Sequence, residues 1–187
     1  KLAYKSGSAI IGARALEEYS TSASAITFED KDVFPAHGVM VKSIKTYGDS
    51  PIDYIISNVA SLFMKVGGPL AQVFEAATRD LEHTDDVKLT SVVSGGLEAY
   101  IDGRHVYCGN ADYFTDNGLP TPTDPEDEIL RGQSSVSIMY LAIDGEVAAK
   151  LYIQYTLDRD FEVTIKQLSR LGICVGIKTF DPNITDL

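Results

Sequence analysis

The chain has 187 residues, of which 44% are hydrophobic and 23% charged, a composition typical of globular domains that excludes a disordered or collagen-like chain. It carries 16 basic and 27 acidic residues, and the formal net charge of −11 argues against a protein that binds nucleic acid. No apolar run approaches the roughly 18 residues that cross a bilayer. The cysteines, Cys108 and Cys174, are too few for a disulfide framework and are expected to be buried in apolar strands.

The first third of the chain alternates helix-like and strand-like patterns. Apolar residues at helical spacing predict a helix over 8–19, and the apolar run 25–28 predicts a short strand that ends in charged residues. Alternating apolar and polar side chains predict a second strand over 39–47. Two helices are then expected, one over 52–63 and one that begins at Pro69.

The middle of the chain is typical of antiparallel hairpins. The dipeptides Asp102-Gly103 and Asp144-Gly145 predict tight turns between strands. Residues 111–116 predict a helical turn, and the proline-rich acidic stretch 120–128 is expected to be a solvated loop. The expected strands are 91–93, 97–101, 105–108, 135–142 and 146–154.

The last elements repeat the helix and strand of the beginning. A helix over 161–171 is expected to precede an apolar strand over 173–177. Helix–strand units at both ends build parallel α/β sheets, whose ligands lie at the carboxyl ends of the strands. We therefore predict an α/β chain whose outer parts form one incomplete domain, with an α+β domain and its antiparallel sheet inserted between them. The predicted boundaries are 1–36, 37–155 and 156–187.

Acidic residues follow both outer strands. Asp30 and Asp32 come after the first strand, and Thr179 and Asp181 come after the last. Of two carboxylates at such a strand end, one can attack a phosphoryl group while the other moves a proton, with Mg²⁺ neutralising the charge between them. A hydroxyl such as that of Thr179 can donate to a phosphoryl oxygen. The alternative is that these residues form a solvated loop.

A resemblance to a known family rests on several stretches in a fixed order. Taken together they resemble the cytosolic loop of a P-type ATPase of the heavy-metal-transporting class, within the haloacid dehalogenase superfamily. The stretches are Lys5-Ser6-Gly7-Ser8-Ala9, Ala25-Ile26-Thr27-Phe28, Gly68-Pro69-Leu70-Ala71, Gly96-Leu97-Glu98-Ala99, Asp102-Gly103-Arg104, Gly109-Asn110, Leu141-Ala142-Ile143-Asp144-Gly145-Glu146 and Thr179-Phe180-Asp181. This resemblance implies that the outer parts form a truncated Rossmann-like phosphorylation domain and that the insert is a nucleotide-binding-like domain.

The resemblance also implies roles for individual residues. Asp30 would accept the γ-phosphoryl group of ATP and Lys31 would steady it. Thr179 would help to bind phosphate, and Asp30 with Asp181 would bind Mg²⁺. Asp32 would join the catalytic residues if its carboxylate moves a proton during the reaction. The residues implied for nucleotide binding are Gly67, Gly68, Gly95, Gly96, Gly109 and Asn110.

Several positions depart from the family's pattern. In the motif Asp-Lys-Thr-Gly-Thr, Asp32 replaces the first threonine and Val33 the glycine. The histidine that contacts adenine is replaced by Gly68, and the first glycine of a Gly-x-Gly pair by Ser94. A hinge aspartate is replaced by Tyr155. An ungapped count from the first strand would instead place Glu29 at the phosphoacceptor position. These departures predict a degenerate pump that binds ATP weakly.

Two alternatives stay open at this stage. Asp30 and Asp32 match the Asp-x-Asp pair of soluble phosphatases of the same superfamily, and loss of several motif positions also fits a non-catalytic regulatory or interaction module. The chain opens without methionine, and the lysine and the Mg²⁺-binding segment that the superfamily places further along are not found before Leu187. We therefore expect a monomeric piece from the cytoplasmic face of a membrane protein, one that does not complete phosphoryl transfer by itself.

Overall fold

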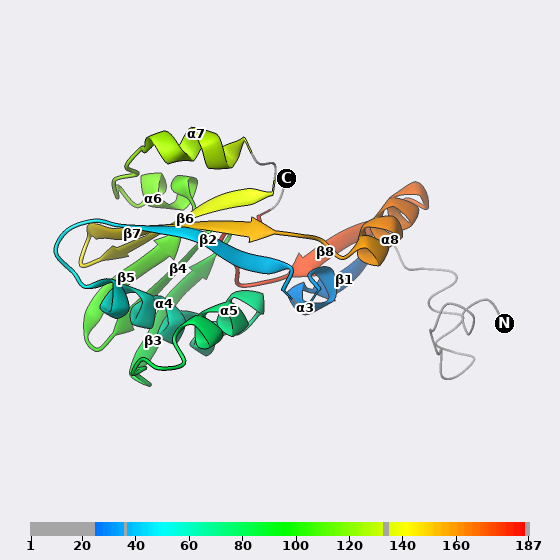
Figure 1. Cartoon of the computed structure of the whole chain (residues 1–187). Coiled ribbons are helices and arrows are strands. Elements are labelled where there is room, and N and C mark those ends of the chain that lie inside the picture. Colours follow the sequence, from blue (N-terminus) through cyan, green and yellow to red (C-terminus); the bar gives the residue numbers. More distant parts are fainter. Residues whose placement is uncertain (1–24, 36, 133–134, 186–187) are drawn as a thin grey trace. The chain divides into compact units, whose positions relative to one another are not determined.

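The computed structural model describes residues 25–35, 37–132 and 135–185 (Figure 1). The helix predicted over 8–19 lies outside these residues. The chain divides into two compact units. Among the described residues, the first unit combines 25–28 with Arg159–Lys178, and the second combines Glu29–Asp158 with 179–185.

The first unit is built on a pair of strands. Strand β1 (Ala25–Glu29) pairs with β8 (Cys174–Lys178), and helix α8 (Arg159–Arg170) precedes β8. Phe28 and Phe161 meet edge to face with their ring centroids 4.9 Å apart. Both strands alternate exposed and half-buried side chains, so the expectation of a buried Cys174 is wrong and its thiol is exposed. Apolar neighbours in the sequence do not bury a side chain that points away from the layer packed on its strand.

The second unit contains a six-stranded antiparallel sheet in the order β2-β7-β6-β5-β4-β3. The turns at Asp102-Gly103 and Asp144-Gly145 have positive φ at both residues, which confirms the predicted tight hairpins. The strands are β2 (Val39–Thr46), β3 (Val87–Val93), β4 (Gly96–Ile101), β5 (Arg104–Gly109), β6 (Val136–Ile143) and β7 (Glu146–Tyr155).

Helices cover both faces of this sheet. Helices α4 (Ile52–Val66) and α5 (Pro69–Ala77) lie on one face, and α6 (Ala111–Asp116) and α7 (Pro125–Arg131) lie on the other (Figure 1). The short helix α3 (Asp30–Val33) follows β1 directly. Apolar residues of α4 that recur three and four apart, including Ile55, Val59 and Leu62, are fully buried, as their spacing predicts. None of the helices in the described ranges is long and apolar enough to cross a membrane.

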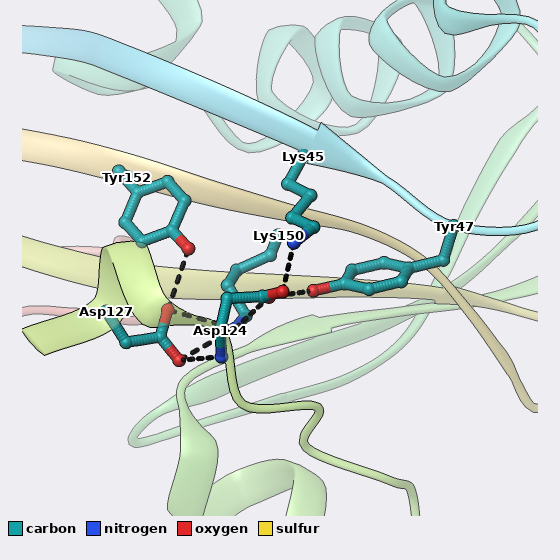
Figure 2. A network of polar contacts seen from close by, with 6 residues as sticks. All are labelled: Lys45, Tyr47, Asp124, Asp127, Lys150 and Tyr152. Atoms are coloured by element: carbon teal, nitrogen blue, oxygen red, sulfur yellow. Dashed lines mark hydrogen bonds and ion pairs between the residues drawn. The ribbon is translucent and has the colours of Figure 1, made fainter.

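The expectation of a solvated loop over 120–128 is wrong at its acidic end. Asp124 precedes α7 and Asp127 lies in its first turn, and both carboxylates face the side chain of Lys150 on β7 (Figure 2). The Lys150 side chain is fully buried, with its Nζ 2.8 Å from Asp124 Oδ2 and 2.9 Å from Asp127 Oδ2. The partners lie more than twenty residues apart in sequence, so the charge pattern of the stretch alone did not indicate them.

Neighbouring side chains complete this buried network. The Tyr152 hydroxyl donates to Asp127 Oδ1 at 2.7 Å. Lys45 on β2 and Tyr47, directly after that strand, both contact Asp124. Although burial alone would raise the pKa of Asp127, hydrogen bonds from Tyr152, the Asp124 backbone and Lys150 hold that pKa below its ordinary range. The network therefore joins α7 to β2 and β7 through charged groups that compensate one another.

Candidate functional site

Two of the predicted site residues meet although 149 positions separate them in sequence. Asp30 is the first residue of α3, directly after β1, and Thr179 follows β8 directly. The Thr179 hydroxyl donates a hydrogen bond to Asp30 Oδ2 at 3.1 Å. The carboxylate expected to accept a phosphoryl group and the hydroxyl expected to bind it are therefore neighbours.

The carboxylate of Asp181 faces Tyr155. The Tyr155 hydroxyl lies 2.7 and 2.9 Å from its two oxygens, and the Asn183 backbone N–H donates to Oδ1 at 3.0 Å. Asp181 is 7% exposed, and this burial, strengthened by the nearby charge of Asp30, raises the pKa of Asp181 to about 6. The predicted metal ligand is thus held by a tyrosine at the position where the family has a hinge aspartate.

Lys31 and Asp32 serve the local structure of α3. Lys31 Nζ pairs with Glu29 Oε2 at 2.5 Å, and this partner raises the pKa of the lysine. Asp32 Oδ2 accepts a hydrogen bond from the Glu29 backbone N–H at 3.1 Å, as a carboxylate in the first turn of a helix often does. Both side chains therefore engage Glu29, while Thr179 engages Asp30.

The glycine pair between α4 and α5 lies beside Asp30. Gly67 and Gly68 have φ values of +84° and +88°, a backbone region that essentially only glycine adopts at their extended ψ. A Cβ placed on Gly68 would lie 2.9 Å from Asp30 Oδ2, whereas one on Gly67 would meet nothing within 4 Å. The segment expected to contact adenine therefore approaches the expected phosphoacceptor through bare backbone.

The second glycine cluster packs against an aromatic ring. Gly96 on β4 pairs with Gly109 on β5, and a Cβ on either would lie within 2.3 Å of Tyr113 ring carbons. Asn110 accepts a hydrogen bond from the Tyr113 N–H and caps α6, while its backbone N–H donates to Gly95 O at 2.9 Å. The Tyr113 ring can therefore pack here only against residues without a side chain, whether or not these glycines also bind a ligand.

An acidic cavity of about 460 Å³ adjoins this cluster. Its lining includes three acidic residues, Glu98, Asp112 and Asp116, beside Ser94 and Asn110, and the Glu98 carboxylate also bonds to His105 Nε2 at 2.6 Å. Asn110 Nδ2 also donates to Pro182 O at 3.3 Å, so the segment after β8 reaches from Asp30 to the glycines of β4 and β5. Three carboxylates near these glycines oppose the approach of a triphosphate.

Two participants were not identified as site residues from the sequence. In the sequence, Tyr155 stands out only as a departure from the family pattern, and its bond to Asp181 depends on a contact between residues 26 positions apart. The amide of Asn183 lies 3.2 Å from the Tyr155 hydroxyl, and no sequence signal indicated it. Within the described ranges, no group of three or more His, Cys, Asp or Glu side chains is placed to hold a metal ion.

These features agree with the family resemblance of the sequence. The chain has an aspartate after β1 and a threonine after β8, and between them in sequence lies a mixed α/β domain with a six-stranded antiparallel sheet. This is the arrangement expected of the headpiece of a P-type ATPase, the cytosolic part that binds nucleotide and is phosphorylated.

Comparisons with known proteins support this class. A copper-exporting P-type ATPase of Staphylococcus aureus (strain bovine RF122 / ET3-1) is 28% identical over 116 residues, which cover 60% of this chain and 14% of that protein. One from Legionella pneumophila is 31% identical over 91 residues, or 48% of this chain and 12% of that protein. The chain therefore matches about a seventh of the length of these relatives. No family model matches the chain.

Solved structures give the same fold. The catalytic domain of the CPx-ATPase CopB-B aligns with 90% of this chain and 56% of its own, with a TM-score of 0.52 and 15% identity. A zinc-transporting PIB-type ATPase aligns with 87% of this chain and 26% of its own, with a TM-score of 0.50 and 19% identity. The resemblance to the cytosolic part of heavy-metal-transporting P-type ATPases is thereby confirmed for sequence and fold.

Proposed function

We propose that the chain is the nucleotide-binding and phosphorylation headpiece of a P-type ATPase-like membrane protein, and that its affinity for ATP is reduced. The observation that carries this proposal is the hydrogen bond from Thr179 to Asp30. In the proposal, Asp30 receives the γ-phosphoryl group while Thr179 donates to a phosphoryl oxygen. The headpiece would lie on the cytoplasmic face, and the three predicted segments, 1–36, 37–155 and 156–187, would form its two domains.

Mg²⁺ belongs to the same proposal. A carboxylate with phosphate oxygens is a ligand set that Mg²⁺ accepts in proteins. Asp30 fits this set because its carboxylate faces Thr179. Asp181 could become a ligand only after its hydrogen bonds with the Tyr155 hydroxyl are broken. When bound, the ion would neutralise charge on the transferring phosphoryl group.

The proposed weak affinity has three supports. Gly68 stands where the family has its adenine-contacting histidine, the acidic cavity opposes phosphate charge, and Tyr155 holds Asp181. The phosphatase alternative gains no support, because the Asp32 carboxylate that would act as general acid is bonded to the Glu29 backbone.

The proposal is tested by urea unfolding of the chain with and without ATP. A ligand that binds only the folded state raises the free energy of unfolding, by about 1.4 kcal/mol at ten times its dissociation constant. We expect ATP to stabilise the chain at millimolar concentrations and Ser94→Gly, which restores the family's glycine, to strengthen the effect. Ser50→Gly, which lies outside the cavity that Ser94 lines, is the control. Absence of stabilisation by ATP in both the native chain and Ser94→Gly would leave the non-catalytic module as the better assignment.

Restoring the family's histidine is expected to fail. Gly68→His introduces a side chain at φ +88° and places its Cβ 2.9 Å from Asp30 Oδ2, so we expect a loss of about 1–3 kcal/mol in the free energy of unfolding and no tighter ATP binding. Gly67→His is the control, since it carries the same backbone strain with nothing within 4 Å of its Cβ. An ATP affinity that rises with Gly68→His would show that the pattern departure, and not the local backbone, limits binding.

A further inference from the structure

A groove runs along one edge of the six-stranded sheet. Within the described residues the sheet ends at β2, and six consecutive residues of that strand, 39–44, line a cavity of about 900 Å³. Consecutive strand residues point to alternate faces, so a cavity lined by all of them follows the edge of the strand. Asp30 and Thr179 do not line this groove, although Lys31, which follows Asp30 in the chain, does.

The opposite wall is one face of α5. Six residues of α5 line it, and all of them except Phe74 recur at intervals of three and four along one stripe of the helix: Pro69, Gln72, Val73, Ala76 and Ala77. All except Gln72 are apolar, and most are small. A strand edge facing such a helix stripe is the geometry in which an extended peptide can add to a sheet.

The charge of the groove is opposite to that of the chain. Its lining includes Lys31, His37 and Lys42 and no aspartate or glutamate, although the chain carries a net charge of −11. Lys31 is paired with Glu29, whereas Lys42 is exposed and forms no ion pair in the described part of the chain. Lys42 is therefore the cation available to an incoming acidic group.

We propose that this groove binds a short extended segment of a partner protein, in which acidic and apolar side chains alternate. The backbone of the segment would pair with the edge of β2, its apolar side chains would lie against the α5 stripe, and its carboxylates would meet Lys42. The register shift between Val41 and Ser43 limits regular pairing, so the segment is short. This inference is independent of ATP binding.

The test uses a fluorescein-labelled peptide, acetyl-Glu-Val-Glu-Val-Glu-Val, and fluorescence anisotropy with the full chain. We expect saturable binding that weakens about tenfold or more in Lys42→Glu, through charge reversal, and in Ala76→Phe, which fills the groove. Lys88→Glu makes the same charge change on β3, the other edge strand, and is expected to leave binding unchanged. Amide shifts in NMR spectra should concentrate on residues 39–44.

Four results would overturn the proposal. The first is no binding at millimolar peptide, and the second is equal binding of the matched peptide with lysine in place of glutamate. The third is equal weakening by Lys42→Glu and Lys88→Glu. The fourth is self-association of the chain that Lys42→Glu abolishes, because that would assign the groove to a second copy. Circular dichroism of each variant separates lost binding from lost folding.

Discussion

Replacing Lys150 with methionine is expected to lower the free energy of unfolding by about 3–5 kcal/mol. The fully buried ammonium compensates Asp124 and Asp127, and its removal leaves two carboxylates inside the protein without their principal cation (Figure 2). Urea denaturation at neutral pH measures the loss. Lys45→Met is the matched control, because the Lys45 side chain is 38% exposed and is expected to contribute only about 1 kcal/mol or less.

A combined variant separates charge from packing. Lys150→Met together with Asp124→Asn and Asp127→Asn removes all three charges and is expected to recover part of the lost stability, since an uncompensated buried charge costs more than a neutral group. If Lys150→Met alone costs no more than Lys45→Met, the network does not hold α7 on the sheet as described.

Replacing Asp181 with asparagine is expected to flatten the dependence of stability on pH between about 4 and 7. Burial raises the pKa of Asp181 from an ordinary value of 3.8 to about 6, so the folded state binds this proton more tightly than the unfolded state. The stability gained from that proton is complete below the unfolded pKa and is lost as the pH rises through the folded one. A difference of this size corresponds to about 3 kcal/mol.

Urea midpoints across this pH range measure the effect. The native chain should lose stability as the pH rises from 4 to 7, whereas Asp181→Asn, which carries no titrating group, should lose much less. Asp49→Asn removes an exposed carboxylate and should behave as the native chain does. Parallel pH profiles for the native chain and Asp181→Asn would contradict the burial of Asp181 against Tyr155.

Local patterns predicted most of the fold. Period-two alternation with the Asp-Gly turns located the hairpins, and three–four spacing located α4. The patterns failed where contacts between residues distant in the sequence determine which side chains are buried. The stretch from Asp124 onward has the composition of a solvated loop, and only the position of Lys150, on a strand that comes later in the chain, places its carboxylates inside.

The proximity of two candidate site residues was predictable from the sequence, and the hydrogen-bond partners of the others were less so. The pairing of β1 with β8 brings Asp30 to Thr179, which the strand-end argument anticipated. The same argument did not predict that Asp32 would accept a hydrogen bond from the Glu29 backbone or that the Tyr155 hydroxyl would donate to Asp181. A carboxylate at a strand end has several donors within reach. These choices depend on side-chain geometry that spacing does not specify.

We propose that the chain retains a weak ATP site at its glycine segments. The most direct measurement is a titration of ATP into the isotope-labelled chain, followed by the amide shifts in NMR spectra. We expect shifts at Gly68, Gly96 and Gly109 that saturate only in the millimolar range. Shifts absent from all three positions up to millimolar ATP would contradict it.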